Sequence, residues 1–126
     1  MRTYHGSCHC GAVRFEIDTD GIDILGACNC SICHKKGALW HRVTADRFRL
    51  LSGKDALQEY RFNTEIARHL FCRHCGIYGF HNPRSAPDAY QINVRCLDDF
   101  DGDLTTLEIK RFDGRNWEAS FEASQR

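Results

Sequence analysis

Apolar and polar residues alternate over several short stretches of this chain. In residues 12–17 the apolar Val13, Phe15 and Ile17 are separated by charged side chains, which is the period of a strand with one buried face. Residues 89–94 alternate in the same way. Further short strands are expected at residues 24–27, 40–43, 48–51, 57–62, 67–71, 107–112 and 117–119.

Turn-forming residues connect these stretches. Asn63-Thr64-Glu65 lies between residues 57–62 and 67–71, and Asp113-Gly114 lies between residues 107–112 and 117–119. Both arrangements predict β-hairpins, and the Asp-Gly pair is the stronger signal. Short helical turns are expected only at residues 31–36 and 97–100. Residues 82–88 contain both prolines and are expected to form a loop near the surface.

The pattern therefore predicts a mainly β fold in which short strands bury a modest core. A length of 126 residues suits one domain, which we place at residues 1–126. Lys and Arg together number 17, as do Asp and Glu, so this balance gives no reason to expect a nucleic acid or a membrane as partner. The start, Met1 to His5, has no apolar run, and we expect a soluble, cytoplasmic protein. The oligomeric state is not indicated.

Cysteine is the residue type that changes this picture. Seven of the eight cysteines fall into three groups, Cys8-x-Cys10, Cys28-x-Cys30-x-x-Cys33 and Cys72-x-x-Cys75. In a reducing compartment, clustered cysteines are more often metal ligands than disulfides. The last pair does not open a helix in a βαβ context, which a thioredoxin-like motif requires. Metal binding is the favoured interpretation.

The first and third groups share one feature, a glycine directly after the second cysteine (Gly11 and Gly76). Glycine adopts backbone angles that turn amide N–H groups toward thiolate sulfurs, as in a zinc knuckle. Two knuckles supply four thiolates, which matches a closed, tetrahedral structural zinc site. A different grouping, with Cys8 and Cys10 joining the middle cysteines, remains open at this stage.

The middle group offers three thiolates within six residues. Three protein ligands and an open position are typical of a catalytic zinc site. The alternative is a fourth protein ligand that closes the site, and His34, His41 and Cys96 are the candidates. Cys96 is otherwise expected to be a small buried residue. His9, His34 and His74 adjoin cysteines, whereas His5, His41, His69 and His81 are expected to be ordinary strand residues.

Four segments resemble the glutathione-dependent formaldehyde-activating enzyme family, whose domain is shared with centromere protein V. They are residues 7–15 (SCHCGAVRF), 28–37 (CNCSICHKKG), 71–76 (FCRHCG) and 91–99 (QINVRCLDD). The resemblance implies a β-tent of packed antiparallel sheets that carries two zinc ions per chain. It also implies a ligand set for each ion: Cys8, Cys10, Cys72 and Cys75 for a structural zinc, and Cys28, Cys30 and Cys33 for a catalytic zinc.

The same resemblance implies a carbon–sulfur lyase that adds a small thiol, glutathione or similar, to an aldehyde such as formaldehyde. Three thiolates make a zinc ion electron-rich, which favours exchange of thiol ligands over activation of water. The alternative is a non-catalytic, zinc-stabilised binding module. The cations that could hold substrate carboxylates are each expected to be solvated on the surface instead. They are Lys35, Lys36, Arg42, Arg84 and Arg95.

Overall fold

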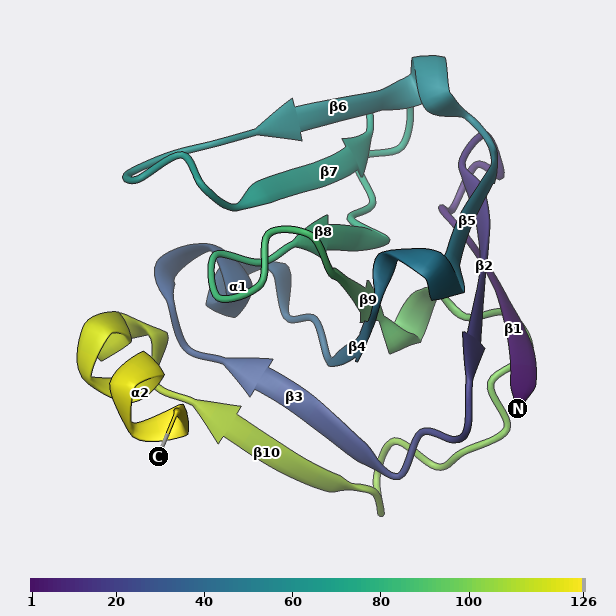
Figure 1. The fold of residues 1–126 in the computed structure, drawn as a ribbon. Helices are drawn as coiled ribbons and strands as arrows, with labels where there is room; N and C mark the ends of the chain where they lie inside the picture. Colours follow the sequence, from purple (N-terminus) through teal and green to yellow (C-terminus); the bar gives the residue numbers. More distant parts are fainter. Residues whose placement is uncertain (126) are drawn as a thin grey trace.

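The fold, a computed structural model that describes residues 1–125, consists of two β-sheets and two short α-helices (Figure 1). The smaller sheet has the order β1-β2-β5, with antiparallel pairing throughout. The larger sheet has seven strands in the order β10-β3-β4-β9-β8-β7-β6. The strands of the smaller sheet are β1 (Arg2–Ser7), β2 (Arg14–Thr19) and β5 (Phe48–Ser52). Those of the larger sheet are β3 (Ile24–Cys28), β4 (Trp40–Val43), β6 (Leu57–Tyr60), β7 (Arg68–Cys72), β8 (Phe80–Asn82), β9 (Tyr90–Asn93) and β10 (Glu108–Phe112). The expected mainly β fold is confirmed.

Aromatic residues form the core between the two sheets. Phe15 on β2 is fully buried and meets Phe80 of β8 edge-on, with ring centroids 5.2 Å apart. Phe48 on β5 stacks on Tyr90 of β9 at 4.0 Å. Gly6 on β1 makes the close packing possible, because a Cβ there would lie 2.2 Å from the Phe15 ring. Offset and edge-on ring pairs add to the free energy gained by burial, so these contacts fix one sheet against the other.

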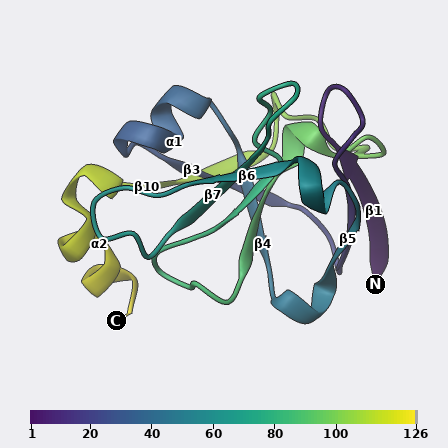
Figure 2. The same cartoon turned by 90° about the horizontal axis from the view of Figure 1, so that it is seen from above.

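The alternation in residues 12–17 and 89–94 predicts the buried faces correctly. Ile17 and Ile92 have no exposed surface, and Val94 has 1%. The hairpin around residues 63–65 is also confirmed: β6 pairs with β7, and Asn63 and Glu65 both adopt positive φ angles. Seen from above, β6 and β7 cross the middle of the view between α2 and β1 (Figure 2).

The prediction of a hairpin around Asp113-Gly114 is wrong. Residues Glu108–Phe112 form a strand, as expected, but this strand pairs in parallel with β3. Residues 117–119, which were expected to form the second strand, belong to helix α2 (Trp117–Ser124). Asp113 does not support a hairpin turn because its carboxylate accepts hydrogen bonds from Asn116 and Asn29. Trp117 and Phe121, four residues apart on one helix face, stack at 4.8 Å.

Smaller differences concern the connecting segments. The short helical turn expected at residues 97–100 lies earlier, as a 3₁₀ helix at Val94–Cys96 that the Asn93 side chain caps by accepting a hydrogen bond from the Arg95 amide. Strands β1 and β8 were not predicted. Residues 82–88 were expected near the surface, yet Asn82 ends a strand and is 3% exposed, and Pro83 is also buried.

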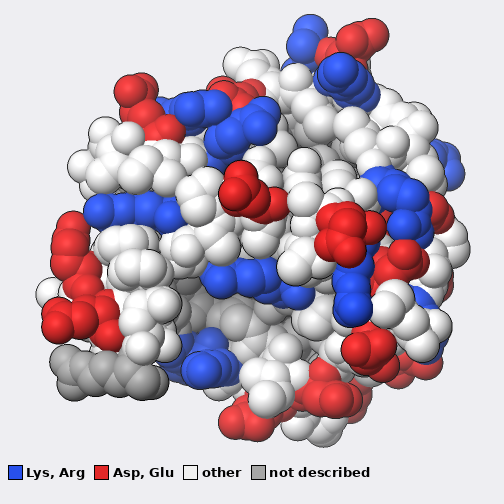
Figure 3. Space-filling model, in the orientation of Figure 1, with Lys and Arg blue, Asp and Glu red and all other residues white. Residues whose placement is uncertain are grey.

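On the face that Figure 3 shows, charged side chains of both signs are mixed rather than gathered into one-sign patches. On the smaller sheet, Arg49 donates to Glu16 at 2.6 Å and to Asp18 at 2.8 Å. The hydrogen bond with the Arg49 guanidinium holds the pKa of Asp18 well below its usual range. Within residues 1–125, neither helix is long or apolar enough to cross a membrane.

Candidate metal centres

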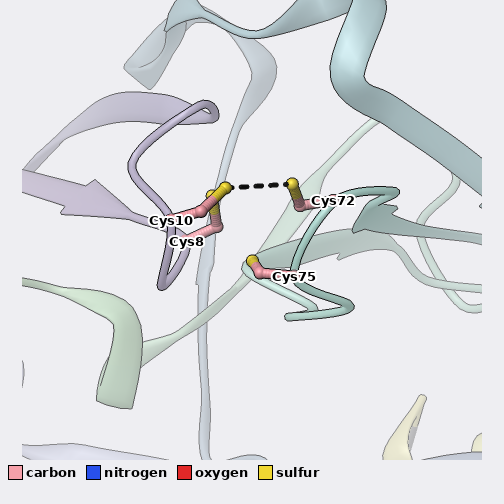
Figure 4. Close-up of side chains that lie close together, drawn as sticks. All are labelled: Cys8, Cys10, Cys72 and Cys75. Atoms are coloured by element: carbon pink, nitrogen blue, oxygen red, sulfur yellow. Dashed lines mark hydrogen bonds between the residues drawn. The ribbon is translucent and has the colours of Figure 1, made fainter.

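The first and third cysteine groups meet in space, although 62 residues separate Cys10 from Cys72. Cys8 and Cys10 follow β1, whereas Cys72 ends β7 and Cys75 lies in the next turn. All four sulfurs lie within 4.8 Å of one another, and Figure 4 shows the four side chains converging from the two loops. We call this set the stapling cluster, because it joins the smaller sheet to the larger one.

The two loops of the stapling cluster share a backbone pattern. The Cys8 amide donates to the Val13 carbonyl and the Cys72 amide donates to the Ile77 carbonyl, each five residues ahead, at 3.0 and 3.1 Å. The glycine after each pair has positive φ, 80° at Gly11 and 76° at Gly76. Both glycine amides turn back toward the carbonyl of the first cysteine. The glycine signal in the sequence therefore located two turns of the same design.

The sulfur spacing of the stapling cluster fits a tetrahedral metal site. The Cys10 sulfur lies 3.6 Å from the sulfurs of both Cys8 and Cys72. Zn–S bonds of about 2.3 Å in a tetrahedron place sulfurs about 3.8 Å apart, whereas a disulfide requires about 2.05 Å. Burial opposes ionisation of Cys75, but backbone N–H groups of Cys10 and Ile77 lower its pKa to about 6. The donor set thus suits zinc.

The middle cysteines form a second group, which we call the triad: Cys28, Cys30 and Cys33, with sulfurs within 4.8 Å of one another. Cys28 ends β3, Cys30 precedes helix α1 (Ser31–Lys36), and Cys33 lies in its first turn. The Cys30 carbonyl accepts from the His34 amide at 2.9 Å, so the helix begins directly after Cys30. Residues three apart at a helix start lie on one side, which brings Cys33 beside Cys30.

The C-terminal part of the chain holds the triad loop in place. Asn29 donates to the Asp113 carboxylate at 2.9 Å, and the Arg115 side chain donates to the Asn29 carbonyl at 2.8 Å. Gly114 packs directly on the cysteines, since a Cβ there would lie 2.5 Å from the Cys28 sulfur. Three thiols on a short loop therefore acquire a fixed arrangement from a segment more than 80 residues away.

The three thiols of the triad influence one another's ionisation. Hydrogen bonds from Cys28 and then Cys33 lower the pKa of the Cys30 thiol. Hydrogen bonds with Cys28 and Cys30, together with burial, raise the pKa of Cys33. One thiolate at a time is favoured here, because three negative charges within a few ångströms repel one another. A divalent cation would remove that penalty, so these donors also fit zinc.

The proposed fourth ligands do not join the triad. His34 is exposed, and the His41 ring is hydrogen-bonded to Thr19 at 2.9 Å. The Cys96 thiol lies 3.9 Å from the Tyr78 carbonyl and packs against the hydrophobic core. Among residues 1–125, the metal-binding group at this place contains three cysteines alone. The alternative grouping of Cys8 and Cys10 with the triad is likewise not the one that the structure has.

The remaining histidines lie mostly where the sequence placed them. His9 and His74 are exposed beside the stapling cluster. His5, His41, His69 and His81 belong to strands β1, β4, β7 and β8. Two of them are more than ordinary strand residues, because His69 and His81 are only 4% and 3% exposed and their rings stack at 5.1 Å.

Lys36 corrects the expectation of solvated surface cations. Its ammonium group lies 2.9 Å from the His69 Nδ1 atom and 4.2 Å above the Tyr78 ring. Burial lowers its pKa to about 8, while the nearby Cys33 and Cys30 charges oppose that shift. Lys35 and Arg95 are exposed as expected. Arg42 donates to Ser85, and Arg84 lies 3.7 Å over Trp117.

Two clefts flank helix α1. One, of about 340 Å³, is lined by Cys28 and Cys33 of the triad and by residues of the C-terminal segment such as Asp113. The other, of about 600 Å³, is lined by Lys35, Lys36 and several aromatic side chains. Cys28 and Cys33 therefore line the smaller cleft, Lys36 lines the larger one, and the stapling cluster lines neither of them.

A family model described as glutathione-dependent formaldehyde-activating enzyme matches residues 3–111. The chain belongs to this family. It is also similar to a Rhodobacter sphaeroides protein known from a crystal structure, with 37% sequence identity and a TM-score of 0.75, over 84% of this chain and 99% of that one. Both cysteine clusters lie inside the matched residues, and together with the family they fit a zinc-binding protein of the formaldehyde-activating type.

The sequence did not reveal the roles of several residues that surround the triad in this chain. Asn29, Asp113 and Gly114 brace the loop, but their roles depend on the parallel β10–β3 pairing that the sequence did not reveal. Lys36 was named among the cations that could hold a substrate carboxylate, but it was expected to be solvated, and its contacts with His69 and Tyr78 were not anticipated. The pairing of His69 with His81 depends on the register of β7 and β8, which alternation alone does not determine.

Proposed function

We propose that this chain is a zinc-dependent carbon–sulfur lyase that joins a small thiol, such as glutathione, to formaldehyde. The observation that carries the proposal is the triad: three converging thiols, with no fourth protein ligand among residues 1–125, beside accessible clefts. Membership of the formaldehyde-activating family supports the reaction type. In this proposal the stapling cluster holds a structural zinc and the triad a catalytic one, which makes two zinc ions per chain.

The reaction is a simple addition. The S–H bond of the thiol breaks, a C–S bond forms at the carbonyl carbon, and the carbonyl oxygen gains the proton to become a hydroxyl group. Cys28, Cys30 and Cys33 would hold the zinc ion, which would supply an open coordination position and lower the pKa of a thiol bound there. The protein's own part is to fix the three cysteines through Asn29, Asp113 and Arg115, and to admit both reactants beside them.

The test is exchange spectroscopy by NMR with glutathione and formaldehyde in the presence of the zinc-loaded protein. We expect the adduct and the free thiol to interconvert faster than in the spontaneous reaction. The Cys96→Ser variant is the matched control, because it removes a cysteine that belongs to neither cluster, and it should retain the acceleration. An exchange rate equal to the spontaneous rate, with two zinc ions bound, would favour a non-catalytic binding module and refute the proposal.

A further inference from the structure

The larger cleft beside α1 has walls of two kinds. Most of its surface comes from apolar and aromatic side chains on β6, on the following turn and on the loop before β8. Its charged members are Lys35 and Lys36, which come from α1. The apolar wall residues are Ile32, Tyr60, Phe62, Ile77 and Tyr78. A ligand that fits this cleft has an apolar body and an anionic group near α1.

Lys36 is held in one place from several sides. Its ammonium group donates to the His69 Nδ1 atom at 2.9 Å, because a neutral ring nitrogen is an acceptor. Tyr78 lies beneath it at 4.2 Å and Trp40 at 5.2 Å, in cation–π contacts. Burial and the Lys36 charge lower the pKa of His69 to about 4, so His69 is neutral near pH 7 and remains an acceptor.

The residue that accepts the Lys36 hydrogen bond, His69, begins a row of paired residues that runs across the larger sheet. His69 pairs across the sheet with His81, and His81 pairs with Gln91, which in turn pairs with Arg42. These four residues lie in one register on one face of the sheet. Burial lowers the pKa of His81 well below its usual value, and the charges of Lys36 and Arg42 act in the same direction. Both histidines are therefore neutral near pH 7, and neither balances the positive charge of Lys36.

Within residues 1–125, no carboxylate forms an ion pair with Lys36. Ion pairs in the described part of the chain involve Asp and Glu with other cations, at the surface. A largely buried ammonium group is costly unless anions balance it, and the nearby charges of Cys33 and Cys30 act in this direction. His69 occupies one of the three N–H groups, which leaves others available to a ligand in the cleft.

We propose that Lys36, held by His69, binds the carboxylate of the thiol substrate in the cleft beside the triad. The proposal rests on the proposed function for the thiol, and it adds the residue that would recognise the carboxylate of that thiol. His69 is the positioning residue. Lys35 shares the cleft but is exposed, and in this proposal it does not select the ligand.

The experiment compares two probes that differ only in charge, 3-mercaptopropionate and 3-mercaptopropionamide, by isothermal titration calorimetry with the zinc-loaded protein at pH 7. We expect the acid to bind about ten-fold more tightly than the amide, as one charge-assisted hydrogen bond would give. In Lys36→Met the two probes should bind equally. Lys35→Met, the matched control on the same helix, should keep the preference.

Two further variants separate charge from packing. Lys36→Arg keeps a cation and should keep most of the preference for the acid. His69→Leu leaves Lys36 intact but removes its acceptor, and it should reduce the acid-to-amide ratio without a loss of zinc. Zinc content measured for every variant shows whether the triad is intact.

The proposal is overturned if the wild-type protein binds acid and amide equally, if neither probe binds, or if Lys36→Met keeps the preference. A preference for the acid without acceleration of the formaldehyde reaction would refute the proposed function alone. Acceleration with equal affinity for the two probes would refute the role of Lys36 alone.

Discussion

The two cysteine clusters contain the same ligand atom but differ in how the chain assembles them. The stapling cluster takes two cysteines from each of two loops, and it joins the smaller sheet to the larger one. The triad takes all three from six consecutive residues, and it joins nothing distant by itself. A metal that closes a long loop reduces the conformational entropy of the unfolded chain far more than one that binds a short loop. We therefore expect the stapling cluster to contribute most to stability and the triad to be the cluster available for chemistry.

Among the substitutions that test this contrast between the two clusters, Cys72→Ser should have the largest effect, a loss of stability. Loss of one of four thiolates removes much of a metal contribution on the order of 10 kcal/mol, comparable with the whole stability of a domain. We expect an unfolded chain at room temperature, measured by circular dichroism and by the dispersion of amide NMR signals. Cys96→Ser is the control and should remain folded. A Cys72→Ser protein that melts like the wild type would contradict the structural role.

Cys30→Ser should affect metal content without unfolding the domain. The triad lies on one loop and helix α1, so the sheets keep their contacts when its metal is lost. We expect the zinc content to fall from two ions to one per chain by elemental analysis, together with loss of the accelerated exchange. If Cys30→Ser unfolds, or if it keeps two zinc ions, the contrast between the clusters is wrong.

Gly114→Ala should have a smaller effect that is confined to the triad. The new Cβ would lie 2.5 Å from the Cys28 sulfur and 2.8 Å from the Cys30 Cβ atom, and overpacking of this kind costs about 1–3 kcal/mol. We expect one of two zinc ions to be released about ten-fold more readily to a competing chelator. Gly21→Ala is the control, since its nearest contact would be at 3.8 Å. Equal release in both variants would show that Gly114 does not shape the triad.

The sequence predicted those parts of the fold that depend on local patterns. Alternation identified the buried faces of β2 and β9, and the glycines at positions 11 and 76 located the two knuckles. It failed where pairing between distant segments decides the structure. The Asp113-Gly114 signal for a hairpin was overridden because the Asp113 carboxylate binds Asn29 and β10 pairs with β3.

The same distinction between local patterns and distant contacts applies to the candidate sites. Cysteine spacing identified the candidate metal ligands but left their grouping open, and the family resemblance implied the grouping that brings the sulfurs together in the structure. The burial of Lys36 could not be predicted in this manner. It depends on His69 and Tyr78, which come from other strands and loops, and a lysine near a helix end is usually solvated.

The hydrogen bonds that join Asn29 to Asp113 and Arg115 have a consequence for folding during translation. Cys28, Cys30 and Cys33 emerge together early in translation, but Asp113 follows Asn29 by 84 residues. A nascent chain thus exposes three unbraced thiols while most of the larger sheet is still being synthesised. Metal captured at that time binds to a mobile loop, and the defined geometry of the triad arises only after the late segment docks.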